Sequence, residues 1–225
     1  MDTSDLAKRM KDYEMRDRYF LQKRIPVAIR VDMRAGHTFT RGFKRPFDDI
    51  FMKSMQETAK YMCENMGNAK LAYIQSDEIT IILVDYDTLE TDCWFNYRTD
   101  KLCSISASMA TMAFNKFFGA NVKSYIRNIM PNILTPLAET YMKAAEKGAM
   151  FDARCFNIPE CEVVNCIYWR QIDAKRNSVQ MLARSIYSHK ELDRKNTAML
   201  LEMCNQKGKD WEKLSNHLKW GSAVK

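Results

Sequence analysis

Two acidic residues lie where carboxylates could hold a metal ion. Asp32 ends a short apolar-biased strand expected over 26–32, and Asp77 lies in a polar insert between β-branched runs at 71–75 and 79–84. Such runs on both sides of a short insert predict a β-hairpin with its acids at the turn. If both strands belong to one sheet, the two carboxylates meet at its end although they are far apart in sequence.

Paired carboxylates on neighbouring strands suit Mg²⁺, which prefers oxygen ligands and near-octahedral geometry. Two such ions about 3.5–4 Å apart bind the attacking and the leaving oxygen of a phosphoryl transfer. A purely structural interpretation also exists, because Ser76 and Asp77 are ordinary turn residues whose side chains bond to nearby backbone groups. The second acid, Asp32, favours the metal site.

The pattern of apolar residues predicts strands that alternate with helices. This alternation is typical of an α+β or α/β domain, and we expect one mainly antiparallel sheet. The expected elements are an amphipathic helix in 3–22, a strand over 26–32, a helix from Asp48 or Asp49 to about 66, the hairpin of 71–84, a helix over 99–118 closed by Gly119, helix and loop over 121–148 punctuated by Pro131 and Pro136, a strand over 151–158, helices over 160–187 and 191–204, and an irregular basic segment from 208 to 225.

The chain of 225 residues has 46% hydrophobic residues, which is enough for one domain with a real core. We expect a catalytic region over 1–150 and, in continuity with it, a last strand and a basic helical region over 151–225. The net charge is +7, and residues 151–225 carry 13 Lys and Arg against 9 Asp and Glu. This excess favours an anionic partner such as nucleic acid, although a solvated helical surface fits the charge equally well.

Cysteine and histidine usage gives poor support for a zinc module. The seven Cys include no C-x-x-C pair, and there are only three His. Buried, reduced thiols are expected instead. No apolar run approaches the 18 or so residues of a membrane span, and no signal peptide is recognised. We therefore expect a cytoplasmic protein without a membrane partner.

Five motifs occur in an order that resembles the tRNA-His guanylyltransferase family and its 3′-to-5′ polymerase relatives. The resemblance covers roughly residues 20–222. The motifs are Asp32 with Arg34 and His37, Phe-Lys-Arg-Pro-Phe-Asp at 43–48, Gln-Ser-Asp-Glu at 75–78, Phe-Asp-Ala-Arg at 151–154, and Trp-Arg-Gln-Ile-Asp at 169–173 followed by Asn177.

The resemblance implies a palm-type catalytic domain that adds nucleotides to the 5′ end of tRNA. A tRNA 5′-phosphate is activated with ATP or GTP, and the 3′-hydroxyl of an incoming nucleotide then attacks it. The resemblance implies two Mg²⁺ ions held by Asp32, Asp77 and the carbonyl of Met33. The expected catalytic residues are Asp32, Asp77 and Glu78; Glu78 is expected to orient the site, with a simple surface acid as the alternative. Family members are commonly tetramers, so a homotetramer is expected.

The resemblance also implies a set of nucleotide contacts. Arg98 and Lys101 match basic positions that meet triphosphate, and cations at a helix start favour a bound anion because they oppose the helix dipole. A solvated helix start is the alternative for these two residues. The full set of implied nucleotide contacts is Met33, Arg34, Ala35, Gly36, His37, Arg45, Ser76, Arg98 and Lys101.

The sequence departs from the family pattern at several positions. Met33 stands where the family usually has Gly, and Gly36 where it has an aromatic residue. Lys175 stands where the eukaryotic tRNA-His enzymes carry a His. These departures favour templated repair of truncated tRNA 5′ ends over strict guanylylation of tRNA-His.

Two other functions fit parts of the pattern. A palm-type nucleotide cyclase also uses two acids on a hairpin, and its activity would be insensitive to salt and need no tRNA. A non-catalytic RNA-binding relative would fail to bind nucleoside triphosphate with Mg²⁺. Asp32, Asp77, Arg98 and Lys101 together argue against the second alternative.

Overall fold

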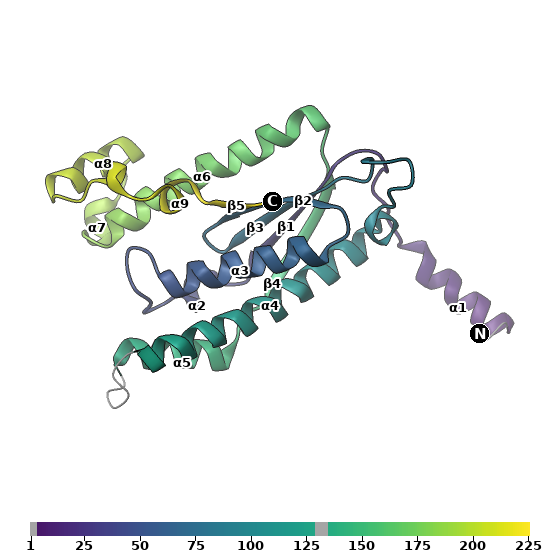
Figure 1. Ribbon diagram of the computed structural model, residues 1–225, viewed down its shortest axis with the longest axis horizontal. Helices are drawn as coiled ribbons and strands as arrows, with labels where there is room; N and C mark the ends of the chain where they lie inside the picture. Colours follow the sequence, from purple (N-terminus) through teal and green to yellow (C-terminus); the bar gives the residue numbers. More distant parts are fainter. Residues whose placement is uncertain (1–3, 129–134) are drawn as a thin grey trace.

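The computed structural model describes residues 4–128 and 135–225 and contains one five-stranded sheet. The strand order is β4-β1-β3-β2-β5, and every neighbouring pair is antiparallel. The predicted α+β class with an antiparallel sheet is confirmed (Figure 1). The strands are β1 (Val27–Met33), β2 (Ala69–Gln75), β3 (Glu78–Leu83), β4 (Phe151–Asn157) and β5 (Ser222–Val224).

Helices cover both faces of the sheet (Figure 1). On one face lie α3 (Asp49–Asn65) and α4 (Thr99–Asn128), and on the other lies α6 (Val163–Arg184), which the 3₁₀ turn η2 (Glu160–Glu162) precedes. Because side chains alternate along a strand, β1 serves both faces. Its odd-numbered residues enter the main core, while Ala28 packs with Cys166 of α6. Arg30 and Asp32 therefore point to the α6 face.

Local signals set the ends of α3, which matches the predicted helix. The side chain of Asp48 accepts a hydrogen bond from the backbone N–H of Phe51 at 2.8 Å, which satisfies a donor of the first turn. The helix buries Phe51, Met55, Ala59 and Met62 along one stripe against the sheet.

An aromatic cluster holds the segment that follows β1. The short helix α2 (Gly36–Phe39) places the Phe39 ring 5.6 Å from Phe114 and 5.3 Å from Phe118 of α4. Phe43 stacks on Phe118 at 5.7 Å. Such pairs add about 0.5–1.5 kcal/mol each beyond the area they bury. The segment after β1 is thus anchored to α4 at Phe39 and at Phe43.

Helix α4 is longer than predicted. Gly119 does not end it, and the helix continues to Asn128. A single Gly inside a helix costs about 1 kcal/mol, and burial of Phe118 and Val122 in the core offsets this cost. After the undescribed residues, which include Pro131, helix α5 (Pro136–Lys147) ends at Gly148 as predicted.

The C-terminal segment is more ordered than predicted. The helix expected over 191–204 is divided into α7 (His189–Leu192) and α8 (Thr197–Gln206). The segment from 208, expected to be irregular, forms η3 (Trp211–Lys213), α9 (Asn216–Trp220) and strand β5, which extends the sheet beside β2. A three-residue strand has no period to detect, so the tertiary pairing decides it.

The predicted N-terminal helix is α1 (Asp5–Arg16), capped by Ser4. All its residues are at least partly exposed, and it projects away from the rest of the molecule (Figure 1). Beyond it, the chain bonds to the turn η1 (Trp94–Tyr97) through a Leu21 N–H to Tyr97 C=O hydrogen bond of 3.0 Å. Over residues 4–128 and 135–225, no helix is both apolar and long enough to cross a membrane.

Candidate active site

The structure brings Asp32 and Asp77 to the same end of the sheet. Asp32 lies opposite Glu78 of β3 and opposite Asp152 of β4. The backbone N–H of Met33 donates to the carbonyl of Asp77 at 3.1 Å, which ties the end of β1 to the hairpin turn. Four carboxylates therefore gather at one corner of the sheet.

This gathering changes the acidity of Asp32. Burial, and after it the negative charges of Asp77, Glu78 and Asp152, together raise the pKa of its carboxyl to about 6, while Arg154 opposes the rise. Burial is the larger cause, and the neighbouring carboxylates add repulsion between like charges. A cation bound here would relieve the repulsion.

The loop of residues 33–37 packs directly on Asp77. Ala35 adopts a left-handed conformation with φ of 56°, and Gly36 follows it into α2. A Cβ added at Gly36 would lie 1.9 Å from Oδ2 of Asp77, so no larger residue fits without moving that carboxylate. Arg34 and His37 are exposed beside it.

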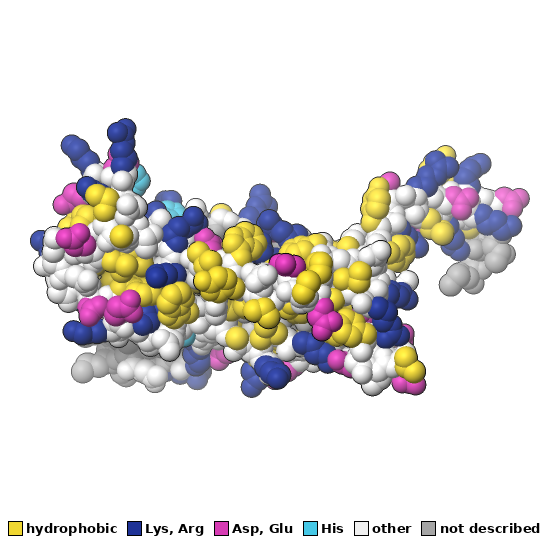
Figure 2. Space-filling model, turned by 90° about the horizontal axis from the view of Figure 1, so that it is seen from above, with side chains coloured by type: hydrophobic (Ala, Val, Ile, Leu, Met, Phe, Trp, Pro, Cys, Tyr) yellow, Lys and Arg dark blue, Asp and Glu magenta, His cyan; other side chains and the backbone are white. Residues whose placement is uncertain are grey.

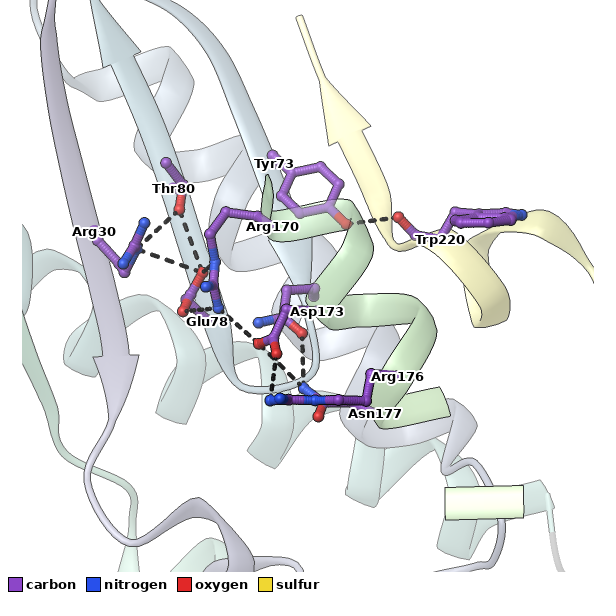
Figure 3. Close-up of polar contacts among 10 residues, drawn as sticks. Arg30, Tyr73, Glu78, Thr80, Arg170, Asp173, Arg176, Asn177 and Trp220 are labelled. Atoms are coloured by element: carbon purple, nitrogen blue, oxygen red, sulfur yellow. Dashed lines mark hydrogen bonds and ion pairs between the residues drawn. The ribbon is translucent and has the colours of Figure 1, made fainter. Parts of the chain in front are cut away.

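Glu78 has a buried partner and does not project into solvent (Figure 3). Nε and Nη2 of Arg170 donate to its two carboxylate oxygens at 2.7 and 2.8 Å. Arg30 lies 3.5 Å from the same carboxylate. Because Arg170 engages both of its oxygens, Glu78 ties the start of β3 to α6.

Helix α6, which carries Arg170, also contacts β2, the other strand of the hairpin. Arg170 donates to Asp173 at 2.9 Å, and Asn177 lies between Asp173 and Gln75, at 3.4 Å from each (Figure 3). Gln75 ends β2 and Glu78 begins β3. Helix α6 thus contacts both residues that flank the turn of Ser76 and Asp77.

Two further expected nucleotide contacts are accessible. Ser76 is exposed at the hairpin turn with φ of 51°, and Arg45 is exposed in the loop before α3. Asp152 and Arg154, interpreted from the sequence as an ion pair, approach to 3.6 Å on the surface of β4.

Arg98 and Lys101 do not join the carboxylates within one chain. The Thr99 carbonyl accepts from Cys155, which pairs with Ile29 near the start of β1. Helix α4 reaches the acidic end of the sheet only at Thr111, whose Oγ1 accepts from the N–H of Phe151 at 3.1 Å. The helix from Thr99 to Thr111 spans about 18 Å at 1.5 Å per residue. The guanidinium of Arg98 instead binds Asp100 in a bidentate pair.

The residues present fit magnesium. Asp32, Asp77 and the Met33 carbonyl offer hard oxygen atoms at one place, and Mg²⁺ is usually bound by one or two carboxylates with water and substrate phosphates. In the part of the chain that the structure describes, no group of three or more His, Cys, Asp or Glu side chains lies in ligating geometry.

Sequence reasoning assigned no role to Arg30, Trp169 or Arg170. Arg30 stands out as the one charge within the apolar run 27–31. Arg170 belongs to a recognised motif, yet its bond to Glu78 depends on how α6 crosses the sheet. Trp169 lies over both guanidiniums.

Comparison with known proteins identifies a family and several solved structures to which this chain is similar. A family model described as tRNAHis guanylyltransferase matches residues 7–159. A bacterial tRNA(His) guanylyltransferase-like protein in complex with ATP is 36% identical, over 98% of this chain and 88% of that chain, with a TM-score of 0.84.

Two further solved structures are similar. A bacterial tRNA(His) guanylyltransferase-like protein in complex with GTP is 34% identical over 98% of this chain and 84% of that chain, with a TM-score of 0.72. The Saccharomyces cerevisiae tRNA(His) guanylyltransferase is 21% identical, over 95% of this chain and 90% of that chain, with a TM-score of 0.69, which shows the shared fold alone.

Proposed function

Because the chain belongs to the tRNA-His guanylyltransferase family of nucleotidyltransferases, we propose that it adds nucleotides in the 3′-to-5′ direction to the 5′ end of a tRNA. It first activates the tRNA 5′-phosphate with ATP or GTP. The observation that carries this proposal is the convergence of Asp32 and Asp77 at one end of the palm-type sheet. Membership of this family decides against the nucleotide cyclase considered from the sequence.

Asp32, Asp77 and the Met33 carbonyl would hold two Mg²⁺ ions. When bound, the ions neutralise charge on the phosphates and bind the attacking hydroxyl, as in other phosphoryl transfers. The protein's own contribution is positioning. Arg170 and Asn177 hold the two ends of the hairpin, and the hydrogen bond from Met33 to Asp77 fixes β1 against the turn.

The nucleotide is bound beside these carboxylates by the loop of residues 33–37. Gly36 lets the loop lie against Asp77, and the exposed side chains of Arg34, His37 and Arg45, together with Ser76, contact the nucleotide. Arg supplies a planar fork of donors that matches phosphate oxygens.

Templated repair of truncated tRNA 5′ ends is the preferred reaction. Lys175 stands where the tRNA-His enzymes carry a His, and its ammonium lies 5.5 Å from the centre of the Trp211 ring and 5.3 Å from that of Trp220. Cation–π contacts with two rings favour a structural role for this side chain.

The proposed assembly is a cytoplasmic homotetramer. The need for more than one chain is supported by Arg98 and Lys101. Both lie at the far end of the sheet from the carboxylates of their own chain. If these residues meet a triphosphate as the resemblance implies, the triphosphate is bound with the help of a second copy.

The test supplies the protein with Mg²⁺, labelled GTP and either full-length tRNA-His or a tRNA without its first 5′ nucleotide. Asp77→Asn keeps the shape of the side chain and removes its charge, so it is the matched control. We expect label in the truncated tRNA and loss of at least about 100-fold in the control, as for loss of a main electrostatic contact. Preference for tRNA-His would restore guanylylation, and no Asp77-dependent label would refute the proposal.

A further inference from the structure

An open hollow lies on the α6 face of the sheet, called the outer face below, between β4 and the start of α6. Its volume is about 300 Å³, at the lower end of the range of small-molecule sites, about 300–1,000 Å³. Figure 2 views the side of the molecule on which α6 lies and shows hydrophobic side chains along it. The hollow is lined by Phe156, Ile158, Glu162, Asn165, Cys166 and Trp169.

Trp169 presents a flat aromatic surface at the edge of this hollow. Two guanidiniums pack against the Trp169 ring. Cζ of Arg30 lies 5.0 Å and Cζ of Arg170 lies 4.6 Å from the ring centre. Both guanidiniums also contact the same oxygen of Glu78, so they do not sandwich the ring from opposite sides. Trp169 is still 54% exposed, which leaves the other ring face open to a ligand.

A buried donor beside Trp169 lacks a partner. Arg30 is only 9% exposed, and among the residues that the structure describes its Nη2 atom has no hydrogen-bond acceptor. A buried charged donor without an acceptor is unfavourable. The atom is shielded from solvent, so Arg30 acts as a fixed positive charge beneath Trp169 and not as a direct ligand contact.

The order of side chains along β1 and β4 matches the order of chemical groups in a nucleotide. Asp32 faces Asp152 at the acidic end, Arg30 faces Arg154 next, and Ala28 faces Phe156 beside the hollow. Each step of two residues is about 6.6 Å along a strand. Acids for a metal-bound phosphate, guanidiniums for a phosphate and an apolar, aromatic floor for a base follow one another.

We propose that Trp169 is a stacking platform for a nucleobase, and that the exposed Arg154 binds the phosphate joined to that base, near the fixed positive charge of the buried Arg30. The inference rests on the proposed function, because it places a nucleotide that extends from the carboxylates across the outer face of the sheet. The nucleotide belongs either to an unpaired RNA strand or to a free nucleoside triphosphate. Stacking on aromatic side chains is tolerant of base identity, which suits a repair enzyme.

The test measures equilibrium binding without catalysis. A fluorescein-labelled single-stranded RNA tetranucleotide with a 5′-phosphate, and separately ATP and GTP, are titrated against the full chain with Mg²⁺. We expect Trp169→Ala to weaken binding of at least one of these probes roughly 5- to 150-fold, the value of one base stack. Trp169→Phe keeps an aromatic ring and should retain most of the affinity. Tyr168→Ala, on the same helix and 60% exposed, is the matched control and should bind normally.

A second variant tests the phosphate contact. Arg154→Gln should weaken RNA binding and reduce the slope of log affinity against log salt by about one. Arg154 is on the surface of an edge strand, so this change leaves the core intact.

Each outcome decides something. Weakening by Trp169→Ala for RNA alone identifies an RNA nucleotide as the occupant, and weakening for ATP or GTP identifies the free nucleotide. If Trp169→Ala binds all probes like the wild type, or if a folded Trp169→Phe loses as much as Trp169→Ala, the stacking site is refuted. A wild type that binds through Trp169 but transfers no label would refute the proposed reaction and leave the binding site standing.

Discussion

Glu78 and Arg170 form a buried bidentate ion pair that joins the hairpin to the helix on the outer face of the sheet. Its two N–O distances are 2.7 and 2.8 Å, and both residues are less than 10% exposed. Glu78 is the immediate neighbour of Asp77, so this pair sets the orientation of the turn that carries a metal-binding candidate. The position of α6 and the position of the acidic turn are therefore coupled.

Removal of Arg170 is expected to be costly. Arg170→Ala leaves Glu78 buried with only Arg30 beside it, and loss of one partner of a buried pair costs about 3–5 kcal/mol in the free energy of unfolding. Urea denaturation measures the loss. The double variant Glu78→Ala with Arg170→Ala should lose less than the sum of the single variants, because no unpaired charge remains.

Arg176→Ala provides the control for this prediction. Arg176 pairs with Asp173 from the same helix but is mostly exposed, and exposed pairs contribute about 0.2–1 kcal/mol. An equal loss for both single variants would contradict a special role for the Glu78–Arg170 pair.

Gly36→Ala should impair the active site more than it impairs the fold. Its Cβ would lie 1.9 Å from Oδ2 of Asp77, so the carboxylate must move. We expect nucleotide incorporation to fall by at least about 10-fold, because displacements of about 1 Å in a catalytic group can cost 100-fold.

The matched control is Gly119→Ala. Gly119 lies within α4, and a Cβ added there has no atom within 4 Å. This change should leave activity unchanged and stabilise the fold by about 0.5–1 kcal/mol, since Ala favours helix over Gly. Wild-type activity of Gly36→Ala would show that the loop does not constrain Asp77.

Stability should depend on pH through Asp32. In the metal-free protein, kept so with a chelator, burial and nearby acids raise the pKa of Asp32 to about 6. The folded protein then binds this proton more tightly than the unfolded chain, so wild-type stability falls as pH rises from about 4 to 6.

Asp32→Asn removes this penalty. At pH 7 the variant should be more stable than the wild type by about 1–2 kcal/mol, a value reduced for partial exposure, and the gain should vanish near pH 4. Thermal unfolding at both pH values measures it. Added Mg²⁺ should raise the melting temperature of the wild type and have little effect on the variant; an equal rise in both would remove Asp32 from the metal site.

Several site features could be predicted from the sequence because they depend on local pattern. The β-branched runs on both sides of Ser76-Asp77-Glu78 indicated the hairpin, and the strand that ends in Asp32 was clear from its composition. Asp48 and Gly148, as helix start and stop signals, marked the ends of α3 and α5.

Other features depend on contacts between distant segments, which no local pattern contains. The pairing of Tyr73 with Ala223 creates β5, and the crossing of α6 over the sheet creates the bond from Arg170 to Glu78. The motif around Arg98 does not indicate the direction of α4. This helix runs antiparallel to β4, so its start lies at the end of the sheet away from Asp32. The unpartnered Nη2 of Arg30 became visible only when its neighbours were placed.

Gly221 is expected to be indispensable for the docking of β5. It has φ of 78°, and a Cβ there would lie 2.5 Å from the carbonyl oxygen of Ile74. Gly221→Ala should lower the free energy of unfolding by more than 2 kcal/mol, measured in urea, because backbone strain and a steric clash add together.

Gly208→Ala separates the two causes. Gly208 has a similar φ of 72°, but a Cβ there meets no atom within 4 Å. Its cost should be limited to the strain of a left-handed residue, roughly 1–2 kcal/mol. Equal losses in both variants would mean that the clash with the Ile74 carbonyl adds nothing to the strain of a left-handed residue.

The separation of Arg98 from Asp77 leads to a prediction about mixed assemblies. Asp77→Asn removes a carboxylate, and the double variant Arg98→Ala with Lys101→Ala removes the basic residues at the far end of the sheet. Each should lower incorporation into truncated tRNA by at least about 10-fold on its own, since each removes charge that phosphoryl transfer requires.

When the two inactive proteins are unfolded, mixed and refolded together, some assemblies contain an intact Asp77 in one chain and intact basic residues in its neighbour. If a site draws on two chains, these assemblies recover part of the wild-type activity, and sedimentation velocity should show a complex larger than one chain. If mixing restores nothing although the mixed complexes form, Arg98 and Lys101 do not act across a subunit boundary. Because about 15–20 Å of chain along α4 separates both from the contact of Thr111 at the acidic end of their own sheet, they would then have no part in the site.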